Sequence, residues 1–149
     1  MFPSVDHAES IMIKTLPALW FAIVMVSLTS TVFARIGDTL EQCKKRYGAP
    51  IASSEKDQSF DFKHEDVKIN IRLHEGKVAA ISYTPPNKEG FTVDQIMSRL
   101  VANNGKGDWN LPERSDDAGT MTWTHEDASR GASIDKGRLL LKVYLLDSK

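Results

Sequence analysis

The sequence predicts an α+β domain in which a six-stranded antiparallel sheet carries two helices on one face. Three observations lead to this prediction. Helix-capping patterns open near residues 37 and 91, alternating apolar and polar residues follow each pattern, and a shift of 61 residues superimposes the two halves of the chain. The chain has 149 residues, of which 41% are hydrophobic and 26% charged, and this composition is typical of one soluble domain.

The first predicted helix begins in the segment 37–41. Asp38 is a residue type whose side chain accepts a hydrogen bond from a free backbone amide at a helix N-terminus. Glu41, three residues later, completes a capping box. Apolar residues three and four apart form the face that we expect to be buried: Leu40, Cys43 and Tyr47.

The second predicted helix opens with Thr92 as its cap and Gln95 closing the box. Its buried stripe is predicted to consist of four apolar residues: Ile96, Met97, Leu100 and Val101. The helix is expected to end at 103–105, where Asn-Asn-Gly interrupts the pattern.

Residues of alternating character after each helix predict strands. In the first half, alternation over 60–63 and 67–73 predicts two strands, Glu75-Gly76 predicts a turn, and a third strand follows over 77–84. The 61-residue shift places Phe62 on Trp123 and Tyr83 on Tyr144. We therefore expect two tandem units of one helix and three strands, 35–86 and 87–149, within a single domain over 35–149.

Residues 1–34 are predicted to be a secretory signal peptide. The run 16–28 is apolar, and Val32-Phe33-Ala34 puts small residues at the two positions that a signal peptidase reads. A buried helix and a retained anchor are the alternatives, but an apolar block of about 13 residues is short of the roughly 20 that a bilayer span needs. The order Met12-Ile13-Lys14 opens as signal peptides do, which favours Met12 over Met1 as the true start.

Cleavage after Ala34 would remove Asp6, Glu9 and Lys14 and leave 18 basic and 18 acidic residues. A net charge of zero gives no field that would gather nucleic acid, and the residue directly after the cleavage site is Arg35, not a Cys that could carry a lipid anchor. We expect a secreted or periplasmic monomer with no stable membrane anchor. The single Cys43 excludes a disulfide within the chain.

Two short segments, 36–41 (Ile-Gly-Asp-Thr-Leu-Glu) and 47–50 (Tyr-Gly-Ala-Pro), carry a resemblance. Together they resemble the signature of the BamE/SmpA and β-lactamase-inhibitor-protein-like (BLIP-like) families: glycine, polar residue, threonine, apolar helix, then Tyr/Leu-Gly-x-Pro. The resemblance implies a BLIP-like domain and a protein-binding role. In outline the chain is also similar to small secreted bacterial proteins of unknown function. BamE-type proteins are lipoproteins with one unit and BLIP-type proteins carry disulfides, whereas this chain has neither feature.

Several residues could carry chemistry. The triplets His64-Glu65-Asp66 and His125-Glu126-Asp127 contain metal-ligand types, but neighbours on a strand point to opposite faces, so we predict polar turns. Cys43 is predicted to be buried; a reactive thiol and intermolecular pairing are the alternatives. Trp109 is predicted to cover one end of the core instead of holding a ligand. No nucleophile elbow, P-loop, dinucleotide fingerprint or zinc spacing occurs, so no enzyme, metal or cofactor is predicted.

The sheet face without helices remains as a candidate binding surface. Strand parity collects nine residues there: Lys68, Asn70, Arg72, Ile81, Tyr83, Ser129, Ser133, Lys142 and Tyr144. Tyr and Arg anchor protein interfaces, so Arg72, Tyr83, Lys142 and Tyr144 are the predicted contacts for an unknown protein partner. The alternatives are a solvated face, an envelope or assembly accessory protein, and a small-ligand binder or weak hydrolase centred on the loop 103–119.

Overall fold

The computed structural model describes residues 33–114, 119–135 and 137–146. They belong to one compact unit, Thr31–Lys149. The predicted signal peptide lies outside the described residues except for Phe33 and Ala34.

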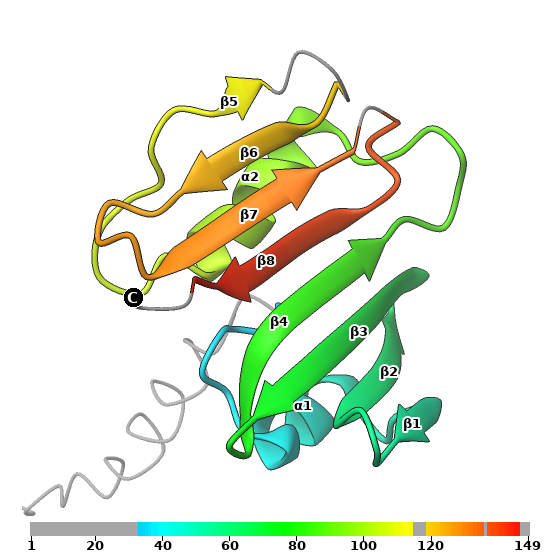
Figure 1. The fold of residues 1–149 in the computed structure, drawn as a ribbon. Helices are drawn as coiled ribbons and strands as arrows, with labels where there is room; N and C mark the ends of the chain where they lie inside the picture. The colour runs from blue at the N-terminus through cyan, green and yellow to red at the C-terminus, as the bar shows by residue number, and fades with distance from the viewer. Residues whose placement is uncertain (1–32, 115–118, 136, 147–149) are drawn as a thin grey trace, which may run out of the picture. The chain divides into compact units, whose positions relative to one another are not determined.

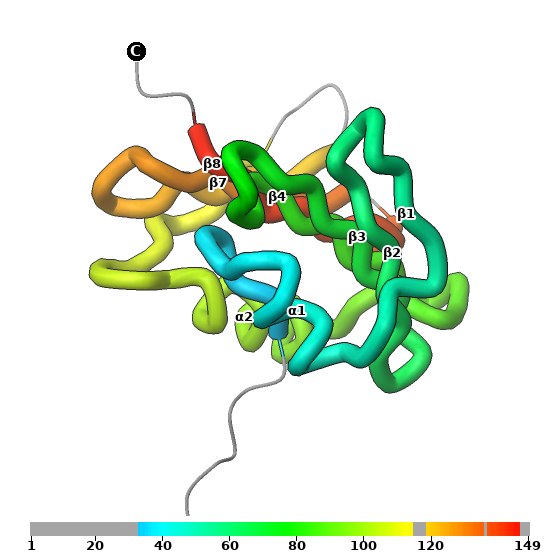
Figure 2. The backbone as a smooth tube through the Cα atoms, turned by 90° about the horizontal axis from the view of Figure 1, so that it is seen from below, coloured from blue at the N-terminus to red at the C-terminus, as the bar shows by residue number. Residues whose placement is uncertain are grey.

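In the described ranges, two helices and one antiparallel sheet form two layers. Helix α1 covers Leu40–Tyr47 and α2 covers Val93–Ala102, and both lie on the same face of the sheet (Figures 1 and 2). The strands run in the spatial order β1-β2-β3-β4-β8-β7-β6-β5. Their bounds are β1 Ala52–Ser54, β2 Ser59–His64, β3 Val67–His74, β4 Lys77–Thr84, β5 Glu113–Arg114, β6 Met121–Thr124, β7 Arg130–Ile134 and β8 Leu141–Leu145.

The prediction of a six-stranded sheet built from two helix plus three-strand units is wrong. The sheet has eight strands, and four strands follow each helix along the chain. The two additional strands, β1 and β5, are the short outermost strands, and their residues carry no alternating apolar pattern. Short, polar edge strands protect a sheet from pairing with other chains. Because they are short and polar, they also carry no periodic pattern that would predict them from the sequence.

Both helices begin with a threonine capping box. At α2, Thr92 and Gln95 form the predicted box. At α1 the prediction is wrong by one residue, because Thr39 accepts from the Gln42 amide while the Gln42 side chain accepts from the Thr39 amide at 2.7 Å. Asp38 lies just before this cap and pairs with Arg46.

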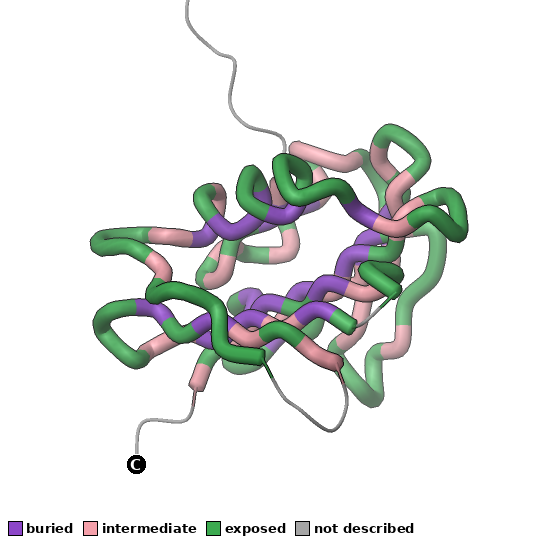
Figure 3. The backbone as a smooth tube through the Cα atoms, turned by 90° about the horizontal axis from the view of Figure 1, so that it is seen from above, coloured by how far each residue is buried: buried purple, intermediate pink, exposed green. Residues whose placement is uncertain are grey.

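The core lies between the helices and the inner face of the sheet, and buried residues run along both layers in Figure 3. Phe62 and Trp123 are 0% and 6% exposed, as the sequence predicted, and Cys43 is fully buried and unpaired. Burial, followed by the nearby Asp38 charge, raises the pKa of the Cys43 thiol to about 11. The thiol is therefore inert near neutral pH.

One extra residue in β4 changes which side chains of that strand face the core. Arg72 pairs with Ala80 and Leu73 pairs with Val78, so Ala79 has no partner and forms a bulge. A bulge shifts the alternation by one residue, so Ile81 and Tyr83 join Val78 on the inner face, where all three are fully buried. The prediction that Ile81 and Tyr83 lie on the open face is therefore wrong.

The N-terminal segment 33–36 packs into the same core. The Tyr83 hydroxyl donates to the Ala34 carbonyl at 3.0 Å, and Ala34 is fully buried. Within the described residues, no helix is long and apolar enough to cross a membrane.

Candidate functional site

The outer face of the sheet carries three of the four predicted contact residues. We define the outer patch as Arg72 on β3 with Lys142 and Tyr144 on β8. Arg72 and Lys142 are exposed and Tyr144 is half-buried. Tyr83, the fourth predicted contact, is fully buried on the opposite face and does not belong to this surface.

Strand register places the patch around a floor of small side chains. One cross-strand row runs from Arg72 through Ala80 and Tyr144 to Gly131. The next row runs through Ser82 and Lys142 to Ser133. Arg72 and Tyr144 are two strands apart, or roughly 10 Å between Cα atoms, and only the Ala80 methyl group lies between them in the row.

Gly131 allows the Tyr144 ring to lie against the sheet. A Cβ atom built on Gly131 would be 2.7 Å from Cε2 of Tyr144, which no real contact tolerates. Because Gly131 has no side chain, the aromatic ring covers its backbone and is held in a fixed place on the outer face. A ring fixed in this way offers contact area to a partner at little entropic cost.

The polar groups of β2 and β3 beside the patch satisfy one another. The Asn70 amide donates to Asp61 at 2.6 Å and to Ser59 at 2.8 Å, and Lys68 pairs with Asp61 at 2.9 Å. Burial acts to raise the pKa of Asp61, but the hydrogen bonds from Asn70 and Lys68 outweigh it and lower that pKa. Asp61 therefore stays ionised and bound to Lys68.

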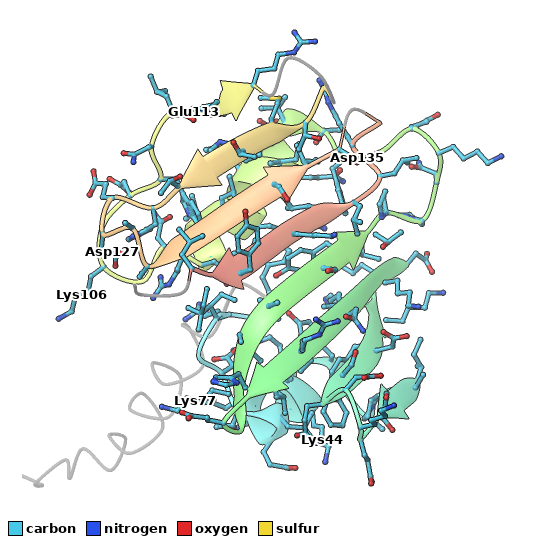
Figure 4. All side chains as sticks on the ribbon, in the orientation of Figure 1. Lys44, Lys77, Lys106, Glu113, Asp127 and Asp135 are labelled. Atoms are coloured by element: carbon cyan, nitrogen blue, oxygen red, sulfur yellow. The ribbon has the colours of Figure 1, made fainter. Side chains whose placement is uncertain are left out.

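The outer patch is positively charged. Among the described residues, neither Arg72 nor Lys142 has an acidic group within 4.0 Å. Glu113, labelled in Figure 4, lies on the outermost strand β5, three strands from β8. Two unpaired cations beside a fixed aromatic ring are suited to an acidic protein surface.

The two His-Glu-Asp triplets both lie at turns, as predicted, but they differ in structure. Glu65 and Asp66 take positive φ angles of 47° and 65° and form the tight turn between β2 and β3. His125 is fully buried, and its Nδ1 lies 2.6 Å from Oδ1 of Asp127, at the β6–β7 turn in Figure 4. Within the described residues, no three His, Cys, Asp or Glu side chains lie close enough together to hold a metal ion.

Asp127 also accepts bonds from the backbone amide and hydroxyl of Ser129. These bonds, followed by the bond with His125, lower the pKa of Asp127. In a catalytic triad the imidazole lies between the serine and the carboxylate, whereas here the carboxylate lies in the middle. The Ser129 hydroxyl therefore faces the Asp127 carboxylate, which is a weak base. The hydrogen bonds between the two residues stabilise the turn and do not activate the hydroxyl as a nucleophile.

Trp109 packs against the core, as predicted. Its Nε1 donates to the Leu100 carbonyl at 2.8 Å, and its ring meets the His125 imidazole edge-on with centroids 5.5 Å apart. The indole therefore covers the buried histidine and closes this end of the core.

One buried arginine was not predicted from the sequence. Arg99 is 6% exposed, and its guanidinium lies 4.5 to 5.4 Å from the ring centroids of three aromatic residues: Phe33, Tyr83 and Phe91. Burial lowers the pKa of Arg99. The only sequence signal is its position, since Arg99 lies three residues after Ile96 on the apolar stripe of α2.

Comparisons with known proteins identify no family for this chain. No family model matches it, and no curated protein matches it. Among solved structures, a DUF4309 family protein (YjgB) from Bacillus subtilis subsp. subtilis str. 168 is similar at a TM-score of 0.42 and 10% sequence identity, over 73% of this chain and 79% of that one.

Proposed function

We propose that the chain is a non-enzymatic, secreted or periplasmic module that binds a protein partner through the outer face of its sheet. The observation that carries the proposal is the outer patch: Arg72, Lys142 and Tyr144 surround a floor of small residues, and the two cations lack acidic partners among the described residues. Interfaces are commonly anchored by Tyr and Arg side chains that enter pockets or meet opposite charge.

The chemistry of the patch identifies the kind of partner. An acidic side chain of the partner would lie over Ala80 and Ser82, between Arg72 and Lys142, while the Tyr144 ring supplies apolar contact. Such a site favours a partner surface with carboxylates in its centre, and its association rate falls as salt screens the charges.

Charge reversal tests the proposal. The double variant Arg72→Glu with Lys142→Glu should reduce binding of an acidic partner captured from the native secretome or envelope by about tenfold or more. Lys45→Glu with Lys106→Glu is the matched control, because both lysines are exposed and lie outside the patch. Equal losses in both double variants would refute the assignment of the outer patch.

A photo-crosslinking residue gives a second readout. Placed at position 144 it should crosslink the captured partner, whereas the same residue at position 45 on α1 should not, because α1 lies on the other face of the sheet. Crosslinking from position 45 alone would place the partner on the helical side and contradict the proposal.

A further inference from the structure

A groove runs along the outer side of α2, on the helical layer of the molecule. Its volume is about 810 Å³, which lies within the range of ligand-binding clefts. One wall is the exposed face of α2, and the other is the N-terminal segment from Phe33 to Ile36. It is separate from the outer patch, which lies on the opposite face of the sheet.

The α2 wall presents apolar side chains to solvent. Met97 and Val101 line the groove and are 43% and 61% exposed, and Val93 continues the same stripe one turn earlier. The prediction that Met97 and Val101 are buried is wrong, because the helix buries Ile96, Arg99 and Leu100. Exposed apolar residues at positions i, i+4 and i+8 form a ridge suited to packing against another helix.

Asn103 fixes the two walls relative to each other. It is 2% exposed, and its side chain accepts from the Ile36 amide at 2.9 Å while donating to the carbonyls of Ala34 and Arg99. One buried amide therefore joins the end of α2 to the N-terminal segment. These bonds fix the spacing of the two walls at the Asn103 end of the groove.

The charged residues that line the groove are two cations, Arg35 on the N-terminal wall and Arg130 at one end, and one anion, Asp94, at the other end. At one end Arg130 donates to the Asn103 carbonyl at 2.7 Å, its Nε has no hydrogen-bond partner, and no carboxylate of the described residues pairs with it. At the other end Asp94, in the first turn of α2, leaves its carboxylate exposed. Helix α2, with ten residues from Val93 to Ala102, spans roughly 15 Å between these ends.

We propose that this groove binds a short amphipathic helix of a partner protein. Its apolar side chains pack on Met97 and Val101, an acidic side chain at one end meets Arg130, and a basic side chain at the other end meets Asp94. A span of about 15 Å corresponds to a helical segment of about ten residues. An acyl chain with a carboxylate would satisfy Arg130 but would leave its apolar end beside the charge of Asp94, so charge complementarity favours the peptide.

Labelled synthetic peptides test the proposal. Four peptides share leucines at helical spacing and differ only in their terminal pair of residues: Lys with Glu, Glu with Glu, Lys with Lys, and Gln with Gln. Fluorescence anisotropy with the purified full chain should show the tightest binding for the Lys/Glu peptide. Met97→Ser with Val101→Ser should weaken that binding by at least about tenfold, because two buried apolar contacts are lost.

Two further variants make the test specific. Asp94→Lys should reverse the preference, so that the Glu/Glu peptide binds best. Leu111→Ser is the matched control, since Leu111 is 89% exposed and lies outside the groove, and it should leave all four dissociation constants unchanged.

The proposal is wrong if the four peptides bind equally, if none binds, or if the Met97/Val101 variant retains full affinity. Dodecanoate serves as the competing ligand, and binding of dodecanoate without binding of any peptide would assign the groove to an acyl anion instead. Arg72→Glu with Lys142→Glu should not change peptide binding, which distinguishes failure of this groove from failure of the outer patch.

Discussion

Strands β4 and β8 pair with each other in the middle of the sheet, yet their tyrosines lie on opposite faces. The 61-residue shift aligns Tyr83 with Tyr144, but Tyr83 is fully buried under the helices and Tyr144 lies over Gly131 on the outer face. The pairing of β4 with β8 is regular, whereas the pairing of β4 with β3 contains the unpaired Ala79. One inserted residue thus decides whether a tyrosine belongs to the core or to the surface.

Insertion of one alanine between Ala80 and Ile81 should have the largest effect on this comparison. The added residue reverses the alternation of β4, so either Ile81 and Tyr83 turn toward solvent or the β3–β4 pairing slips. Exposing two buried side chains costs roughly 3 to 6 kcal/mol, a large share of a domain's stability. We expect loss of cooperative unfolding in denaturant, measured by circular dichroism. Deletion of Ala79 is the matched control and should retain cooperative unfolding, because the pairs Arg72–Ala80 and Leu73–Val78 then become consecutive and both faces of β4 stay as they are.

Truncation of the two tyrosines should separate the faces directly. Tyr83→Ala removes a fully buried ring and should lower the free energy of unfolding by about 3 to 5 kcal/mol, as other large aromatic truncations do. Tyr144→Ala should lower the free energy of unfolding by about 1 kcal/mol, because the ring is half-buried and water can fill the space that it leaves. Denaturant unfolding of the two variants gives the ranking, and the reverse order would contradict the assigned faces.

Removal of the Tyr83 hydroxyl alone should give an intermediate effect with a pH signature. Tyr83→Phe loses the bond to Ala34 and should cost about 1 kcal/mol at neutral pH. Burial raises the pKa of Tyr83, so the unfolded chain ionises first, above about pH 10, and stability falls as the pH rises further. Tyr83→Phe should lose less stability than the wild type between pH 8 and about pH 11. An equal loss in both proteins would show that Tyr83 ionises as readily in the folded state as in the unfolded state.

Tyr144→Phe should have the smallest effect on stability, within about 0.5 kcal/mol, because no hydrogen bond of its hydroxyl to the described residues is lost. Calorimetric unfolding measures this difference. A loss as large as that of Tyr83→Phe would mean that the Tyr144 hydroxyl also stabilises the fold. The two tyrosines would then differ only in the burial of their rings.

The sequence predicted the features that depend on neighbours along the chain. The Thr92 box, the buried Cys43 and the inward Phe62 and Trp123 all follow from capping or periodicity within a few residues. The bulge at Ala79 has no such signal. Because Ala79 and Ala80 are both small, the sequence of this strand is compatible with Ile81 and Tyr83 on either face of the sheet. The same ambiguity moved Tyr83 onto the wrong face.

Long-range contacts explain why the groove could not be predicted. Asn103 looks like an ordinary helix end in sequence, and its side-chain partners Ile36 and Ala34 are 67 and 69 residues away. The pairing of such distant positions depends on the assembled fold, and periodicity carries no information about it. The prediction that Arg72, Lys142 and Tyr144 share the outer face is right, because β3 and β8 keep a regular alternation through these residues.

The burial of Ala34 constrains when the chain could be processed. A peptidase acting after Ala34 needs that bond extended and accessible, but in the folded domain Ala34 is fully enclosed and its carbonyl is bound by Tyr83 and Asn103. Cleavage there would have to occur before the domain folds. It would also leave two buried donors, the Tyr83 hydroxyl and the Asn103 amide, without their acceptor. Cleavage after Ala34 and burial of Ala34 in the core would therefore exclude each other, and the order of the two events would determine which molecule results.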